Sequence, residues 1–441
     1  MPPQPPDGDL PEHDPDPPLE PLPPPTQPSV PDELPPSDTE AILCEHDCFY
    51  FSAAGDDAAD GTDETSAWKT LQKVNTVSWK PGDKILFRRG DTWTGALKLG
   101  TSGTELEPII LGAYGVGERP VFRNPGGTWN RAITLDADYV IVQDLLVRDT
   151  SEAGIFIEKG AEHNILRNIE GVALGQAVVI KGNNNKVTGS YFHDGVMVVD
   201  TEGGDDDFGA NGVVIRSSGN EIAYNRILRA KATSHDYGYD GGAIEFYSTD
   251  QSMNDNSIHH NWAQDCNGFM ELGSRGGQEL KNTLVSYNVS YNNGSIAGIH
   301  LGTTGFGAKV EDLRLENNTI VELSGLKDNL FWIWSPAVPT TLSLTNNIIY
   351  SKVKFGASNQ VGFTHTNNLY YFIGGAALTI TPGSDEWSGK DPGFVDLAGL
   401  DFHLRSDSPA IDVGKDLGHS LDYDGTTVPS GVRPELGAYE R

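Results

Sequence analysis

The pattern of hydrophobic and polar positions repeats itself from about residue 130 onward. Each repeat opens with a short alternating run, whose copies are Gly154–Glu158, Ala177–Lys181, Gly212–Arg216, Gly242–Phe246, Gly268–Leu272, Gly298–Leu301 and Asn329–Ile333. A second run follows, in which an apolar residue stands three positions before a small polar one. Those polar residues are Asp144, Asn168, Ser190, Asn225, Asn261, Asn288, Asn318 and Asn347. Alternation predicts short strands, and the turn-forming residues between the runs predict tight connections.

Successive copies lie 22 to 36 residues apart, and none shows a helical period. A unit this small cannot bury its own apolar face, so the units must stack on one another. The recurring asparagine fits an internal ladder in which each side-chain amide binds its copy in the next coil. A β-propeller is the rival fold, but its blades need about forty residues and four strands each. The repeats therefore predict an all-β solenoid of parallel strands with roughly nine to eleven coils.

Two further groups of residues frame the repeats. The first group is the opening Phe49–Asp57, Ala67–Gln72 and Lys80–Phe87; the second is the closing Asp391–Phe394, Ser408–Asp412 and Gly437–Glu440. Together with the repeats, they resemble the right-handed parallel β-helix superfamily of pectate-lyase-like, secreted, carbohydrate-active enzymes. The resemblance extends over nearly everything after residue 45. It implies a fold rather than a reaction, because this superfamily includes lyases, hydrolases, epimerases and adhesins.

Composition divides the chain into a linker and a folded part. The net charge is −31, but residues 1–44 hold ten acidic residues, no Lys or Arg, and sixteen of the 27 prolines. A segment of this kind buries too little to fold, so we expect a disordered linker that joins another module or a cell-surface anchor. Residues 45–441 then form one β-helix domain: an N-terminal cap and first coils (45–130), central coils (131–371) and a C-terminal segment (372–441).

The same numbers limit the partners. An acidic chain lacks the clustered basic surface that nucleic acid requires, and no apolar run is long enough to span a bilayer. The opening residues show no signal-peptide pattern, which is typical of a trimmed chain. We expect an extracellular monomer, secreted or held at the cell surface. Cys44 and Cys48 could form a local disulfide there, while Cys266 lies in an apolar pattern and is expected to be a buried free thiol.

Alternation also predicts which side chains of the first runs point outward. Ile244 and Phe246 face the core, so Glu245 faces out, and the same rule places Glu271 outside. Aligning the runs gives one outward column and, two residues further along each strand, a second. The first column is Val214, Glu245, Glu271, His300 and Trp332; the second is Arg216, Tyr247, Gly273, Gly302 and Trp334.

The two glutamates are the candidate catalytic pair. Stacked carboxyl groups repel, which raises the pKa of one and leaves a proton donor beside an ionised neighbour. The strand spacing matches the separation of the two carboxyl groups in retaining glycosidases. Outward aromatic rings would hold sugars, and long loops before the strands at 212 and 242 would wall the site. The candidate substrate-binding residues are Asp240, Tyr247, Arg275, His300, Trp332, Trp334, His235 and Arg216.

Three hypotheses follow for the function. The first is a glycoside hydrolase that needs no cofactor. The second is a polysaccharide lyase or uronate epimerase with Arg275, Tyr239, His235 or Lys231 as base. Its Ca²⁺ would be held by Asp205, Asp206 and Asp207, together with Asp236 and Asp240, because hard oxygen ligands suit that ion. The third is a non-catalytic, glycan-binding adhesin.

Overall fold

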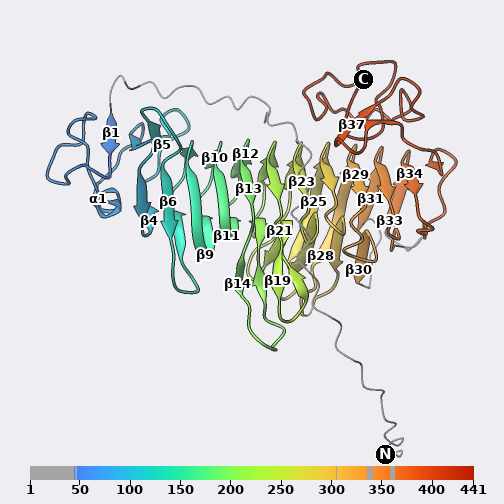
Figure 1. Cartoon of the computed structure of the whole chain (residues 1–441), viewed down its shortest axis with the longest axis horizontal. Coiled ribbons are helices and arrows are strands. Elements are labelled where there is room, and N and C mark those ends of the chain that lie inside the picture. The colour runs from blue at the N-terminus through green and yellow to red at the C-terminus, as the bar shows by residue number, and fades with distance from the viewer. Residues whose placement is uncertain (1–43, 45–46, 304, 335–340, 358–362) are drawn as a thin grey trace, which may run out of the picture.

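The protein is a parallel β-helix in which three sheets run along one solenoid axis (Figure 1). This computed structural model describes residue 44 and residues 47–303, 305–334, 341–357 and 363–441. The predicted fold is confirmed, since every strand-to-strand pairing within the three sheets is parallel between neighbouring coils. The linker predicted at residues 1–44 falls almost wholly outside the described residues, and the division into domains stays a prediction.

The first sheet contributes one strand per coil. It has twelve strands among the described residues, one more than the upper end of the roughly nine to eleven coils expected. They are β1 (Cys48–Phe51), β2 (Lys84–Arg88), β5 (Ile109–Tyr114), β8 (Val140–Gln143), β10 (Ile165–Arg167), β12 (Lys186–Thr188), β17 (Glu221–Ala223), β22 (Ser257–His259), β25 (Glu279–Ser286), β28 (Lys309–Glu316), β31 (Leu342–Thr345) and β33 (Phe363–Thr366).

The second and third sheets follow the first within each coil. The second holds β3 (Thr92–Thr94), β6 (Val121–Asn124), β13 (Tyr191–His193), β18 (Arg226–Leu228), β23 (Trp262–Gln264), β26 (Val289–Tyr291), β29 (Thr319–Glu322), β32 (Ile348–Ser351), β34 (Leu369–Phe372) and β35 (Trp387–Ser388). The third holds β4 (Leu97–Leu99), β7 (Arg131–Leu135), β16 (Asn211–Ile215), β21 (Gly242–Ser248), β24 (Met270–Ser274), β27 (Ala297–His300) and β30 (Phe331–Trp334). Two long strands, β9 (Leu146–Ile157) and β11 (Glu170–Ile180), pair in both sheets, with a register shift between them near Leu174.

The remaining elements lie at the ends and on one edge of the solenoid. The helix α1 (Leu71–Thr76) packs at the N-terminal end, and Thr70 caps it by accepting a hydrogen bond from the Lys73 backbone. Two hairpins, β14 (Met197–Val199) with β15 (Phe208–Gly209) and β19 (Ala232–Ser234) with β20 (Gly238–Asp240), project beyond the strands beside β21 (Figure 1).

The predicted asparagine ladder is present between the first and second sheets. Side-chain amides join Asn225, Asn261, Asn288, Asn318, Asn347 and Asn368 in sequence at 2.9–3.0 Å. Asp144 and Asn168 were expected in this ladder, but they lie one residue before it. They occupy the left-handed turn position, with φ of 61° and 52°, and the backbone of Ile169 takes the ladder position by donating to Ser190. Asn and Asp tolerate that conformation, so one composition suits both positions.

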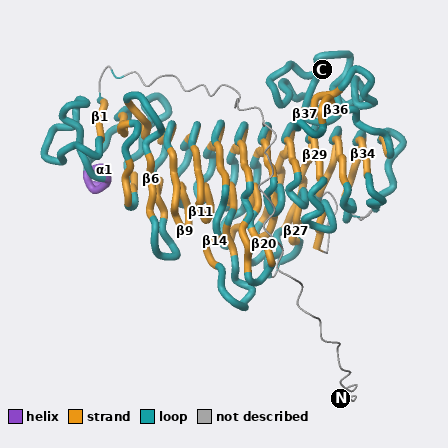
Figure 2. The backbone as a smooth tube through the Cα atoms, in the orientation of Figure 1, coloured by secondary structure: helices purple, strands orange, loops and turns teal. Residues whose placement is uncertain are grey.

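The C-terminal segment covers the outer face of the second sheet. The antiparallel pair β36 (Phe394–Asp396) and β37 (Asp401–Leu404) belongs to a second apolar core, in which Trp262 of the second sheet stacks on Phe402 at 5.7 Å. In Figure 2 this segment lies above the last coils, near β29 and β34. The outward tryptophans of the third sheet are therefore not its contact, and Trp334 remains 45% exposed.

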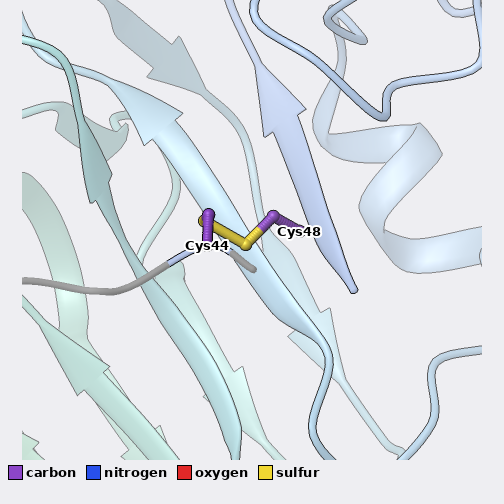
Figure 3. Close-up of a disulfide and its surroundings, with 2 residues drawn as sticks. All are labelled: Cys44 and Cys48. Atoms are coloured by element: carbon purple, nitrogen blue, oxygen red, sulfur yellow. A yellow bond between two sulfur atoms is a disulfide. The ribbon is translucent and has the colours of Figure 1, made fainter. Parts of the chain in front are cut away.

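The structure decides the pairing that the sequence left open for Cys44 and Cys48, and it confirms the prediction for Cys266. Cys44 and Cys48 form a disulfide at the entry to the first coil (Figure 3), and Cys266 is a buried free thiol. Among the described residues, no helix is long and apolar enough to cross a lipid bilayer.

Candidate active site

Glu245 and Glu271 lie opposite each other on neighbouring strands of the third sheet. The register of β21 with β24 pairs them directly, as the alternation predicted. The inward neighbours of Glu245, Ile244 and Phe246, are buried, so its own side chain faces out. Glu245 is partly buried, whereas the side chain of Glu271 is 55% exposed. The two carboxyl groups therefore share one face but differ in their access to water.

That difference shows in the acidity of Glu245. Burial raises its pKa to about 8, and the charges of Glu271 and Asp240 act in the same direction. Arg216 opposes the shift but does not cancel it. Glu245 is thus mostly protonated at neutral pH, which is the state that a general acid requires.

His300 contacts Glu271 from the adjacent strand β27, where it lies two residues beyond Gly298, the partner of Glu271. A ring nitrogen of His300 lies 2.8 Å from a carboxylate oxygen of Glu271, and its ring stacks on Trp334 with centroids 4.1 Å apart. Trp332 and Trp334 are 6.1 Å apart and nearly parallel, and Trp332 donates to the Asn329 carbonyl oxygen. The site thus combines a carboxylate pair with two indole rings.

The predicted columns need a correction at β27. Gly298, not His300, stands beside Glu271 and Trp332, and His300 stands beside Trp334 in the second column. Gly302 follows β27 and is not part of either column. A shift of two residues leaves the same side chains facing out, so alternation alone cannot detect it. Gly298 leaves room here, since a Cβ on it would lie 3.6 Å from the Trp334 ring.

Three other predicted substrate-binding residues are Tyr247 and Arg216 of the second column and Arg275, which follows β24. Tyr247 follows Glu245 on the same face, and its ring centroid is 5.9 Å from that of the exposed Phe306. Arg275 is exposed just after β24. Burial raises the pKa of Tyr247, and the charge of Arg275 opposes this rise. The Nε atom of Arg216 is buried with no hydrogen-bond partner among the described residues.

Asp240 approaches the glutamates from the end of β20. Burial raises its pKa to about 6; its hydrogen bond from Gly241 lowers it, and the charge of Glu271 raises it. Lys327 also lies close, although the sequence reading missed it. Burial lowers the pKa of Lys327, while Glu271 and Asp240 act in the opposite direction. Lys327 belongs to the turn before β30, where the alternation of the strands gives no signal for it.

The remaining acidic loop residues gather on the two hairpins. Two groups of side chains bring their ligand atoms within 4.8 Å of one another: Asp206, Asp207 and Asp236, and Asp200, Asp207 and His235. The first supplies only carboxylate oxygens, which suits Ca²⁺.

Three predicted members of this loop region have other partners. His235 lies 2.7 Å from Asp200, and its hydrogen bond with that carboxylate raises the His235 pKa. Asp205 instead accepts a hydrogen bond from the Tyr237 hydroxyl. Lys231 lies over the Tyr239 ring, 5.3 Å from its centroid. The predicted residues thus form a glutamate group on the third sheet and an acidic group on the hairpins. Asp240 interacts with both, since the charges of Glu271 and Asp207 each raise its pKa.

Comparisons with known proteins agree on the fold. No family model matches the chain. "Pectate lyase L" of Paenibacillus polymyxa (strain SC2) is 26% identical over 330 residues, which is 70% of this chain and 64% of that relative. The chain thus spans less than two thirds of that relative's length. "Lacto-N-biosidase" of Bifidobacterium longum subsp. longum is 36% identical over 85 residues, 18% of this chain and 5% of that protein. The crystal structure of pectate lyase Pel9A superposes with a TM-score of 0.61 at 17% identity, covering 89% of this chain and 96% of Pel9A.

Proposed function

We propose that the protein is a polysaccharide-degrading enzyme, and that it is a glycoside hydrolase that uses Glu245 and Glu271. The observation that carries this proposal is the raised pKa of Glu245 directly beside the exposed carboxylate of Glu271. A protonated carboxyl next to an ionised one is the arrangement of glycosidases. The flat faces of Trp332 and Trp334 supply apolar contacts for sugar rings.

In the proposed reaction, Glu245 donates its proton to the glycosidic oxygen as the bond to the anomeric carbon breaks. Neighbouring strands are about 4.8 Å apart, which favours the retaining mechanism with Glu271 as nucleophile. Water then attacks the anomeric carbon of the glycosyl-enzyme, and Glu245 takes up the proton that water releases. His300 holds Glu271 in position through its ring nitrogen.

Replacing either glutamate with glutamine tests this proposal. We expect Glu245→Gln and Glu271→Gln to lower turnover by about 10²–10⁴-fold while glycan binding persists. The assay is mass spectrometry of products from a panel that includes polygalacturonate, alginate and lacto-N-type oligosaccharides. Hydrolysis adds the mass of water to the products. Full activity in both variants would contradict the role of the pair.

A polysaccharide lyase is the second candidate function, and Lys327 favours it. Burial lowers the pKa of Lys327 even though the charges of Asp240 and Glu271 oppose this shift, and a lowered pKa makes a lysine a better base. The group of Asp206, Asp207 and Asp236 could hold Ca²⁺, which would neutralise a uronate. The names of Pectate lyase L and pectate lyase Pel9A agree with this candidate. An unsaturated product that is abolished by Lys327→Met and by a chelator would favour elimination over hydrolysis.

We also propose that the protein acts outside the cell, as a monomer joined through residues 1–44 to another module or an anchor. The Cys44–Cys48 disulfide supports an oxidising compartment. An adhesin is the remaining hypothesis, and bound glycan without any product would favour it.

A further inference from the structure

The outward column that contains Glu245 changes character at that residue. On the three preceding coils its members are Phe156, Val179 and Val214, which are paired in register. All three face away from the solenoid interior, yet they are only 2%, 0% and 0% exposed. With Ala153 they form an apolar cluster separate from the main core. These three positions of the column are therefore covered up to Glu245.

Named side chains contribute to this cover. The Arg131 guanidinium lies 3.4 Å from the centroid of the Phe156 ring, and Glu152 and Glu158 hold it there at 2.7 and 2.8 Å. Gly175 lies on the strand that carries Val179, and it leaves room for the buried Val198 of the β14 hairpin, whose Cγ2 would be 2.6 Å from a Cβ at Gly175. The cover is thus a packed part of the fold.

Beyond Glu245 the same column is open. Glu271 is 55% exposed, Gly298 has no side chain, and Trp332 is partly buried. The flanking Trp334 and Phe306 are 45% and 53% exposed. A ligand can therefore contact the column on the C-terminal side of Glu245 but not on its N-terminal side.

We propose that the enzyme acts at a chain end, with the glycan extending from Glu245 toward Trp334 only. This inference rests on the proposed function. A chain that passed across the glutamates in both directions along the solenoid would need contact with Val214 and Val179, which are covered. Glu245 therefore stands at the closed end of the binding surface, and the enzyme releases short products of one size.

Product sizing over time tests this direction. The probes are polygalacturonate, alginate and reducing-end-labelled oligosaccharides of the lacto-N type, each incubated with the whole chain. We expect one short product from the earliest time point and a viscosity that falls in proportion to bonds cleaved. A ladder of intermediate sizes with a rapid loss of viscosity would overturn end-wise action while leaving the proposed function intact.

A binding measurement gives a readout that does not depend on turnover. Hydroxyl-radical footprinting of Glu245→Gln, with Glu271→Gln as a second variant, uses the same oligosaccharides. We expect at least fivefold protection of Trp334 and Phe306 and none of Trp129, which lies on the closed side and is 61% exposed. Protection of Trp129 and of Phe208, its ring neighbour at 5.8 Å, would overturn the inference. If no probe is bound or cleaved, the proposed function fails and the inference falls with it.

Discussion

Two stretches of the third sheet share one backbone and differ on their outer face. From β9 to β16 the outward residues Phe156, Val179 and Val214 are buried, whereas from β21 to β30 the outward column carries glutamates and an indole. Their inward residues are apolar in both stretches and belong to one hydrophobic core. The inward residues therefore determine the fold of both stretches, whereas the outward residues determine which stretch a ligand can contact.

The sequence carries a mark of this difference. Strands buried on both faces form continuous apolar runs, and strands with one wet face alternate. Ile155–Ile157, Val178–Ile180 and Val213–Ile215 are continuous, and from β9 onward the first polar residue in the column is Glu245. Glu245 therefore occupies the boundary between a dry and a wet stretch. Its position there explains how a carboxyl on an outer face acquires a raised pKa.

Placing a charge in the covered stretch should have the largest effect. Val179→Asp puts a carboxylate where the exposed fraction is 0%. The nearby cation Arg131 already binds Glu152 and Glu158. We expect a loss of about 3–5 kcal/mol in the free energy of unfolding, measured by urea denaturation.

Thr134→Asp is the matched control, because Thr134 belongs to the same column but is only partly buried and pairs with Lys98. We expect a change within about 0.5 kcal/mol there. Equal losses in the two variants would mean that the outer column is not divided into covered and open stretches.

Much of this arrangement could be predicted from the sequence, because repeated strands must stack and their period of two fixes which residues face out. The pairing of Glu245 with Glu271 follows from that rule and is observed. The position of His300 was wrong by two residues, since a two-residue shift preserves the inward and outward sets. The register is defined by the backbone hydrogen bonds between the two coils, in which Phe269 donates to the Ser295 carbonyl oxygen and Met270 to that of Ile296.

Contacts made by loops were beyond the sequence pattern. The turn holding Lys327 has no repeating composition, and its approach to Asp240 depends on how two connections fold over one edge. His235 binds Asp200, a contact that the strand pattern does not indicate. Alternation constrains strands alone, so residues contributed by loops can be found only once the chain path is known.

The boundary position of Glu245 predicts an intermediate effect that depends on pH. Burial raises its folded pKa from 4.5 to about 8, so the folded state holds a proton that the unfolded state has released. The stability is therefore full below pH 4.5 and is lost as the pH rises toward 8. Glu245→Gln removes this loss. We expect the variant to be about 1–3 kcal/mol more stable than the native chain at pH 9 and equal to it at pH 4, by thermal or urea unfolding.

Asp194, which directly follows β13 of the second sheet, provides a control because its pKa is shifted in the opposite direction. Its hydrogen bonds with Arg229 lower its pKa to about 2 despite burial, so its stabilising contribution is present above pH 3.8 and is lost as the pH falls. Asp194→Asn should destabilise the chain at pH 7 and progressively less below pH 4. A difference for Glu245→Gln that did not vary with pH would argue against a buried proton at the boundary.

The smallest expected effect comes from partly covering the open stretch. Gly298→Ala adds a methyl group 3.6 Å from the Trp334 ring and 3.7 Å from the Glu271 side chain, distances of ordinary contact. The free energy of unfolding should stay the same or rise by about 0.5 kcal/mol, because alanine loses less backbone entropy than glycine. Glycan affinity should fall several-fold, since the methyl group takes space between the carboxylate and the indole.

Gly212→Ala is not a neutral control, because its Cβ would meet the Ala243 carbonyl oxygen at 2.5 Å. Gly100→Ala is suitable, with nothing within 4 Å of its Cβ, and unchanged affinity in both variants would show that the open column does not contact the ligand.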